Sequence, residues 1–330
     1  MAIREDVRYS MKLKALYYLY EKNYTQTEIA KILNISRVTL GKWLDEAREE
    51  GMIKFEIVDI KNELSLFHLE DEMKERFHLK EVRLISSVDL DDSGVMWKIA
   101  INAASYFEQL IHSDMKVGLT WGRTLNAMVN ELSGDRRIGG LTIYTLVGNA
   151  PNDAAFQPNI LAQNLLSKYN GSLKILTAPF LCYSAKLCSD IKHDPQIATI
   201  LQETKDLDIT LVGIGEEPMA DEKTLSDYPF DDTIIQDLIR NGAVGDICGN
   251  FFDITGKPCD TILRDRILSI DIQELLRHKM VIGMGGGSRK VKSLLGALHG
   301  SYLDVLITDD QTAREVLALE DIYITKHGRD

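Results

Sequence analysis

The sequence has few of the features that mark a membrane-bound, secreted or metal-binding protein. Only four of its 330 residues are cysteines, and none has CxxC spacing: Cys182, Cys188, Cys248 and Cys259. We therefore expect buried thiols in a reducing cytoplasm, with no disulfide, metal or cofactor. No run of about 18 uninterrupted apolar residues occurs, and the N-terminal segment lacks the apolar stretch of a signal peptide. These absences favour a cytoplasmic protein without a membrane partner.

Positive charge is also scarce, but it is unevenly distributed. The whole chain has a net charge of −12, yet residues 1–61 contain 11 Lys and Arg against 10 Asp and Glu. The acidic excess therefore lies in the remainder of the chain. Because phosphate neutralisation is local, an acidic remainder does not prevent an N-terminal segment from binding DNA. The length and the 45% share of apolar residues indicate two globular domains of unequal size.

The N-terminal residues show the pattern of three helices. Residues 9–21 carry a stripe of apolar side chains at helical spacing, which we expect to lie in a small core. Thr25 and Glu28 form a capping box that opens a second helix, and Ser36 is a suitable N-cap for a third that ends near Gly51. Residues 52–58 favour a β-wing or a strand leading out. The stripe of the first helix consists of Leu13, Leu16, Tyr17 and Tyr20.

Residues 26–44 (QTEIAKILNISRVTLGKWL) fit the template of a helix-turn-helix. Ala30 stands where the two helices cross closely. Asn34 stands at the turn, where glycine is usual and asparagine is the next best residue for a positive φ. The expected core of this motif consists of Ile29, Leu33, Ile35, Leu40 and Trp43. The pattern predicts an all-α DNA-binding domain.

The start of the third helix predicts which side chains contact DNA. Residues near the N-terminus of a recognition helix reach base edges in the major groove. Arg37 is suited to a bidentate contact with guanine, and Val38 and Thr39 to a thymine methyl group. The predicted set consists of Gln26, Thr27 and Lys42 at phosphates, Arg37, Val38 and Thr39 at bases, and Ser36 at the helix start. A three-helix domain that binds protein instead is the alternative.

A longer amphipathic helix is expected over residues 62–79. Its stripe consists of Leu66, Leu69, Met73 and Phe77. This helix either packs on its own domain or also dimerises the protein, and four apolar positions are too few to indicate a coiled coil. We expect the domains to span residues 1–60 and 80–330, with residues 61–79 as the connecting helix.

Beyond residue 80, short apolar runs alternate with helical segments. This alternation predicts an α/β domain with a mainly parallel sheet covered on both faces by helices. Residues 243–258 interrupt the alternation and indicate a hairpin insertion with a turn at Asp253–Gly256. The expected strands are 82–85, 117–121, 141–147, 173–176, 209–214, 267–270, 280–284 and 305–308.

One strand leads into a glycine-containing turn and then a helix, at residues 117–125 (VGLTWGRTL). A helix N-terminus offers free backbone N–H groups and the positive end of the helix dipole. The amides near Gly122–Thr124 and the Thr124 hydroxyl are therefore suited to hold a phosphate group.

Several segments together resemble the SorC/DeoR-type sugar-binding transcriptional regulators. The resemblance rests on the helix-turn-helix and on residues 118–125, 146–149, 156–161, 244–258 and 281–317. It implies a tetrameric DNA-binding protein whose larger domain shares the fold of sugar-phosphate isomerases and CoA transferases. It also implies a small phosphorylated sugar as the effector that alters operator binding. The implied effector-binding residues are Gly122, Arg123, Thr124, Gln157, Asp246 and Lys290.

The chemistry of these residues agrees with the resemblance. A lysine at position 290 would complete the neutralisation of a phosphate, and the Asp246 carboxylate can accept two sugar hydroxyls. Each of these residues also has an interpretation that involves no ligand. Lys290 would belong to a solvated basic helix start, Asp246 would form a turn, and Gln157 would simply be exposed.

Other functions are less well supported by the sequence. A sugar-phosphate isomerase or deaminase with a DNA-binding appendage needs an acid or base over the sugar carbonyl, and only Asp246 is a candidate. The glycine-rich stretch at residues 283–288 would suit a nicotinamide cofactor, but too few residues follow it for a dinucleotide domain. We therefore expect no enzyme activity. The expected protein is a homo-oligomeric (dimeric or tetrameric) regulator of a carbohydrate-metabolism operon. The sugar, the operator and the sense of regulation stay open.

Overall fold

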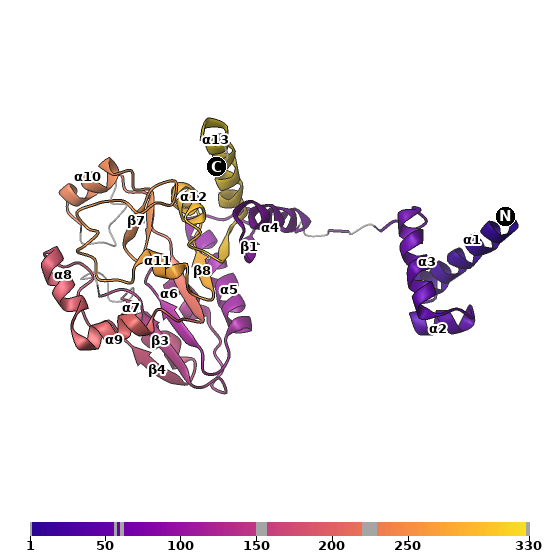
Figure 1. Cartoon of the computed structure of the whole chain (residues 1–330), viewed down its shortest axis with the longest axis horizontal. Coiled ribbons are helices and arrows are strands. Elements are labelled where there is room, and N and C mark those ends of the chain that lie inside the picture. The colour runs from indigo at the N-terminus through magenta and orange to yellow at the C-terminus, as the bar shows by residue number, and fades with distance from the viewer. Residues whose placement is uncertain (1, 56–57, 60–62, 150–156, 220–229, 328–330) are drawn as a thin grey trace. The chain divides into compact units, whose positions relative to one another are not determined.

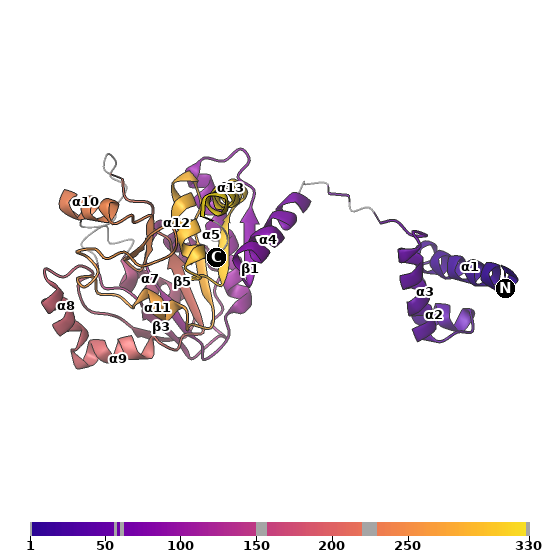
Figure 2. The same cartoon turned by 45° about the horizontal axis from the view of Figure 1, so that its top comes forward.

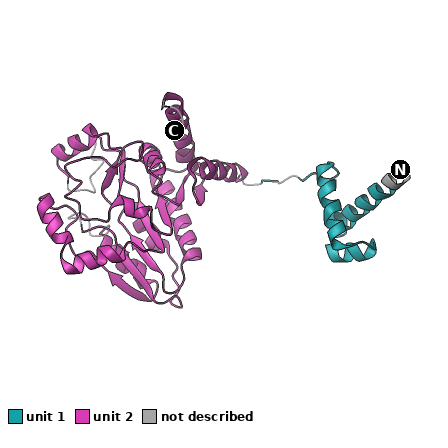
Figure 3. Ribbon diagram, in the orientation of Figure 1, with its two compact units in different colours: residues 1–61 teal, residues 62–330 magenta. Residues whose placement is uncertain are grey.

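A computed structural model of the chain describes residues 2–55, 58–59, 63–149, 157–219 and 230–327. The chain divides into two compact units, Met1–Lys61 and Asn62–Asp330 (Figure 3). No helix among the described residues is long and apolar enough to cross a membrane.

The first unit is all helical. It contains α1 (Ala2–Leu16), a five-residue π-helical continuation (Tyr17–Glu21), α2 (Gln26–Ile32) and α3 (Arg37–Glu49). The expected caps are confirmed. The Thr25 hydroxyl accepts the Glu28 N–H while the Glu28 carboxylate accepts the Thr25 N–H, and the Ser36 hydroxyl accepts the Thr39 N–H at 3.0 Å. Asn34 has the expected positive φ of 51°.

The core of this unit is built from a different face of α1 than the sequence predicts. Leu16 is buried, but Leu13, Tyr17 and Tyr20 are 50%, 46% and 39% exposed. Both faces of α1 carry apolar side chains, so periodicity alone does not identify the inner one. On α3, Leu40 is buried as expected, whereas Trp43 is only partly buried. The buried core consists of Ala15, Leu16, Ile29, Ala30, Leu40, Leu44 and Ala47.

The segment after α3 does not form the expected strand. Residues 52–55 and 58–59 have no strand conformation, and residues 56–57 lie outside the described residues. Met52 and Ile53 instead pack against the helical core. A wing needs a second strand to supply hydrogen-bond partners, and the described part of this unit contains none.

The second unit is built on a seven-stranded, fully parallel sheet in the order β1-β9-β8-β5-β2-β3-β4 (Figure 1). This confirms the expected α/β class. The strands are β1 (Glu81–Ile85), β2 (Lys116–Leu119), β3 (Leu141–Thr145), β4 (Gly171–Lys174), β5 (Ile209–Gly213), β8 (Val281–Met284) and β9 (Val305–Asp309).

Helices cover both faces of this sheet, and Figure 2 shows the layers from a second angle. One face packs against α5 (Asp92–Leu110), α6 (Arg123–Glu131) and α7 (Pro158–Ser167). The other packs against α4 (Leu64–Phe77), α12 (Val291–His299) and α13 (Asp310–His327). Within α4, Leu69 and Met73 are buried in this second core and Leu66 and Phe77 pack against it. The stripe of α4 therefore packs on its own unit.

The remaining elements lie around the sheet. They are α8 (Ala185–Lys192), α9 (Pro195–Glu203), α10 (Asp232–Arg240), α11 (Ile272–Leu275), the 3₁₀ turn Ser288–Lys290, and the antiparallel pair β6 (Gly245–Ile247) and β7 (Asn250–Phe252).

One expectation in this region is confirmed and another needs correction. A hairpin forms, and the expected turn at Asp253–Gly256 is present: the Gly256 N–H donates to the Asp253 carbonyl and the Asp253 N–H to the Lys257 carbonyl, both at 2.9 Å. A further reversal, at Cys248–Gly249 with φ of 58° and 75°, joins β6 to β7. Two positive φ values are the geometry that matches the twist of a two-residue hairpin. Residues 267–270 do not form a strand of the seven-stranded sheet and make only isolated bridges, Ile267 with Leu181 and Ser269 with Val147.

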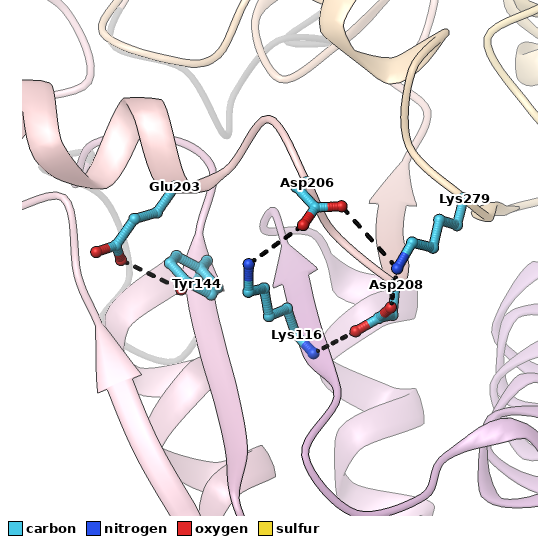
Figure 4. A network of polar contacts seen from close by, with 6 residues as sticks. All are labelled: Lys116, Tyr144, Glu203, Asp206, Asp208 and Lys279. Atoms are coloured by element: carbon cyan, nitrogen blue, oxygen red, sulfur yellow. Dashed lines mark hydrogen bonds and ion pairs between the residues drawn. The ribbon is translucent and has the colours of Figure 1, made fainter.

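Ion pairs join the strands at their amino ends (Figure 4). The Asp208 carboxylate accepts the Lys116 N–H at 2.8 Å and the Lys279 ammonium at 2.7 Å. The exposed Asp206 contacts the Lys116 ammonium at 3.4 Å. These contacts hold the amino ends of β2, β5 and β8 beside one another. They do not involve the carboxyl ends of these strands, which lie at the opposite edge of the sheet.

Candidate functional site: the recognition helix and the carboxyl edge of the sheet

The start of α3 presents a largely exposed polar surface. Arg37 and Lys42 are exposed and Val38 is 71% exposed, whereas Thr39 is partly buried. The Thr39 hydroxyl lies 2.8 Å from the Ser36 hydroxyl, so both hydroxyls already take part in the helix cap. Gln26 and Thr27, in the first turn of α2, are exposed.

The cations of this surface are available for an external partner. Within the described residues, no hydrogen bond or ion pair involves the side chain of Arg37 or Lys42. By contrast, Lys12 on α1 contacts Glu46 at 2.7 Å and Glu50 at 2.6 Å. Its hydrogen bond with Glu46 is the main reason that the pKa of Lys12 is raised. The unit thus pairs its inner Lys12, while Arg37 and Lys42 of α3 stay exposed.

The strand order creates a switch point between β2 and β5. From β2 the chain continues outward to β3 and β4, and from β5 it continues the other way to β8 and β9. In open parallel sheets, the crevice at the carboxyl ends of such a strand pair is the usual ligand site. The turns that follow these two strands are therefore the natural place to look for an effector.

The turn after β2 has the geometry expected of an anion-binding helix start. Gly122 precedes α6 with a φ of 134°, and a side chain added there would meet no atom within 4 Å. Thr124 lies half-buried in the first turn of α6. Arg123 is 58% exposed at its side chain and contacts Glu216, which follows β5, at 3.6 Å. This ion pair spans the switch point.

The hairpin brings Asp246 to the same place. Asp246 is buried, and its Oδ2 accepts the Gly249 N–H at 2.9 Å. Its backbone carbonyl accepts the Gly215 N–H at 2.9 Å. A Cβ atom on Gly215 would lie 1.9 Å from Asp246 Oδ1, so only glycine allows this approach. The sequence reasoning missed Gly215, although a glycine directly after a strand is the same signal that identified Gly122.

The turn after β8 brings Lys290 against the same loop. The Lys290 ammonium donates a hydrogen bond to the Ile214 carbonyl, and its side chain runs beside Gly285, where an added Cβ would lie 3.2 Å from Lys290 Cδ. The glycine turn is fixed by the end of β9 and the start of α13, because the Gly287 N–H donates to the Thr312 hydroxyl of α13 at 2.7 Å and to the buried Asp309 carboxylate of β9 at 3.2 Å. The sequence analysis did not predict the roles of Asp309 and Thr312 in holding this turn.

The structure thus brings most of the predicted effector-binding residues together around one loop. Arg123, Asp246 and Lys290 all contact residues 214–216, and Gly122 and Thr124 lie beside Arg123. Gln157 directly precedes α7, on the connection that leaves β3, the neighbour of β2. An aromatic pair lines the same region. The Trp121 and Phe180 rings are 4.4 Å apart, and an added Cβ on Gly249 would meet Phe180 at 2.6 Å.

Comparison with known families gives a match over most of the chain. The Sugar-bind family, described as "Putative sugar-binding domain", matches residues 61–318. This range contains all seven strands of the sheet and every predicted effector-binding residue.

Two regulators are similar along nearly the full length. The deoxyribonucleoside regulator of Bacillus subtilis (strain 168) is 28% identical over 315 residues, which cover 95% of this chain and 98% of that protein. The sorbitol operon regulator of Klebsiella pneumoniae has the same identity and coverage. The crystal structure of full-length SorC, the Klebsiella pneumoniae sorbitol operon regulator, aligns with a TM-score of 0.72 at 27% identity, covering 95% of this chain and 99% of that one.

Proposed function

This chain belongs to the Sugar-bind family of SorC/DeoR-type transcriptional regulators, and from that premise we propose that it controls a carbohydrate-metabolism operon in response to a phosphorylated sugar. Its first unit binds operator DNA in the cytoplasm. Its second unit binds the effector, and the two ligands alter one another's affinity. Such coupling requires that the effector bind differently to the two operator-binding states.

The exposed start of α3 supports the DNA-binding role. Arg37 and Lys42 carry positive charge that no described residue neutralises, and the N-terminal turn of a recognition helix is the part that enters the major groove. Gln26 and Thr27 on α2 contact the phosphates, and Arg37, Val38 and Thr39 contact the bases.

The effector-binding role is supported by three segments that meet at the loop after β5: the turn after β2, the turn after β8, and the β6–β7 hairpin. Gly122 and Thr124 offer a helix start with a positive dipole end, and Lys290 supplies a cation from the neighbouring turn. Asp246 supplies a carboxylate for sugar hydroxyls. Since its Oδ2 already accepts a backbone N–H at 2.9 Å, Asp246 is a fixed acceptor rather than a mobile base, which favours a regulator over an isomerase.

An exposed apolar stripe along α1 and the start of its π-helical continuation supports a homo-oligomer. Tyr9, Leu13 and Tyr17 follow one another at four-residue spacing and are 55%, 50% and 46% exposed. The stripe is symmetric about Leu13, so an antiparallel pair of α1 helices would place Tyr9 of one protomer opposite Tyr17 of its partner. An interface of this kind is self-complementary, as a two-fold axis requires.

A thermal-shift screen of the full-length protein against pentose and hexose phosphates tests the effector class. A ligand that binds only the folded state raises stability by RT ln(1 + [L]/Kd), about 2.7 kcal/mol at 100 times Kd. We expect one or more sugar phosphates to stabilise the protein and to change its affinity for its own promoter DNA. The unphosphorylated sugars serve as controls. Absence of sequence-selective binding to that DNA at low salt, with or without sugar phosphates, would contradict the proposal.

A further inference from the structure

The loop that follows β5 lies between the two basic turns of the effector site. Glu216 contacts Arg123, on the turn after β2, with 3.6 Å between Oε1 and Nη2. Glu217 contacts Lys292, at the start of α12, with 2.9 Å between Oε1 and Nζ. Two adjacent carboxylates of one loop therefore face cations on opposite sides of the switch point.

Backbone contacts hold the same loop in place. The Ile214 carbonyl accepts the Lys290 ammonium, and the Gly215 N–H donates to the Asp246 carbonyl at 2.9 Å. The Glu216 and Glu217 side chains are only 16% and 30% exposed, so solvent screens these carboxylates less than it screens fully exposed ones. The loop is thus fixed in a position that brings its acceptors to the cations.

Space for an anion is open beside one of these pairs. A surface hollow of about 330 Å³ is lined by the polar residues Glu217, Ser288, Arg289, Lys292 and Glu315 and by the apolar residues Met219, Val291 and Leu319. Two cationic side chains and a hydroxyl therefore border the same hollow as the carboxylates of Glu217 and Glu315. An anion that enters it meets the partner of Glu217 directly.

We propose that Glu216 and Glu217 are built-in competitors for the effector's phosphate, which replaces them at Arg123 and Lys292. This inference rests on the proposed effector site. A carboxylate brings one negative charge and two oxygens, whereas a phosphate dianion brings up to two charges and three acceptor oxygens. The phosphate therefore forms the stronger contacts, and the exchange releases the loop from its two side-chain anchors.

This exchange also explains which ligands the site selects. A neutral sugar has no charge with which to replace a carboxylate, so it leaves both ion pairs intact. A phosphorylated sugar replaces the two side-chain anchors of the loop, those of Glu216 and Glu217, and its binding is coupled to a change in that loop. Glu216 and Glu217 are therefore specificity-determining residues that do not themselves bind the sugar.

Titration of the full-length protein with inorganic phosphate, at constant ionic strength with chloride as the balancing anion, tests the competition. In Glu216→Gln the competing charge is removed, and we expect half-maximal thermal stabilisation at about three- to ten-fold lower phosphate than in the wild type. The matched control is Asp206→Asn. It removes the same charge from an exposed ion pair with Lys116, 3.4 Å, at the opposite end of β5, and should leave the midpoint unchanged.

The outcomes separate this inference from the proposed function. If the wild type responds to phosphate or to a sugar phosphate and Glu216→Gln responds at the same or a higher concentration, the competition does not exist. If no variant and no wild-type sample responds to any of these anions, the effector site itself is wrong and the inference fails with it. Glu217→Gln, whose partner lies on the other turn, repeats the test should Glu216→Gln not fold.

Discussion

Gly215 is a position where a single added carbon atom should disturb both the stability of the fold and the binding of the effector. In Gly215→Ala the new Cβ would lie 1.9 Å from Asp246 Oδ1, so the buried carboxylate must move. We expect a stability loss of roughly 1–3 kcal/mol from overpacking and a loss of the effector's thermal shift. Gly139→Ala is the control, because its nearest contact is an ordinary 3.9 Å. A normal effector response in Gly215→Ala would show that Asp246 does not set the site.

Arg37 and Lys42 should differ in the way they affect DNA binding. We expect Arg37→Ala to lose about 1–3 kcal/mol of specific binding and to relax the preference at one base pair. Lys42→Ala should weaken binding to all sequences alike and reduce the salt dependence, because a phosphate contact carries no base information. Quantitative shift assays on operator variants at several salt concentrations distinguish the two. Equal behaviour of the two variants would remove Arg37 from the base-reading set.

At the scale of elements, the ion pairs at the amino ends of the strands predict a pH dependence. Burial raises the pKa of the Asp208 carboxyl, but hydrogen bonds from the Lys116 N–H and the Lys279 ammonium outweigh burial and leave the pKa below its ordinary value. The contribution of Asp208 is therefore present at neutral pH and is lost as pH falls through the lowered pKa.

Asp208→Asn tests this sign. Because two charge-assisted hydrogen bonds are weakened, we expect a loss of roughly 1–3 kcal/mol at pH 7. The difference from the wild type should shrink once the pH falls below about 4, the ordinary pKa of aspartate. Urea unfolding of both proteins between pH 3 and 7 measures it. A difference that does not change over this range would exclude the charge of Asp208 as its source.

The elements that the sequence predicts well are those determined by short-range chemistry. The Thr25 capping box, the Ser36 cap and the left-handed Asn34 depend on residues within a few positions, and each is present. The inner face of α1 and the failed strand at residues 267–270 depend on what packs beside them, which local periodicity does not contain.

The same division applies to the effector site. The turn at Gly122 is predictable because strand, glycine and helix follow directly in the sequence. The contact between Arg123 and Glu216 is not, because it requires β2 and β5 to be neighbours in the sheet. The strand order places β2 beside β5 as well as beside β3, and this order does not follow from the local sequence. The functional roles of Gly122 and Glu216 stay predictions.

For the whole molecule, α12 connects the glycine turn after β8 to contacts with α13 and α4. It begins directly after Lys290 and ends at His299, whose Nε2 lies 2.7 Å from Glu320 on α13 and whose ring lies 6.5 Å from that of Phe77 on α4. A shift of α12 would therefore act on α4, which is the first helix after the first unit in the chain.

Assembly of the protein is the last property that one substitution can test. Leu13 stands at the centre of the exposed stripe of α1, so Leu13→Asp would place two buried carboxylates opposite each other in a symmetric pair. We expect the variant to lose its preference for DNA with two half-sites over DNA with one, because a recognition-helix pair needs a fixed spacing. Leu187→Asp, on α8 with 44% exposure, is the matched control. Fluorescence anisotropy with both DNA lengths measures the preference, and an unchanged ratio in Leu13→Asp would place the interface elsewhere.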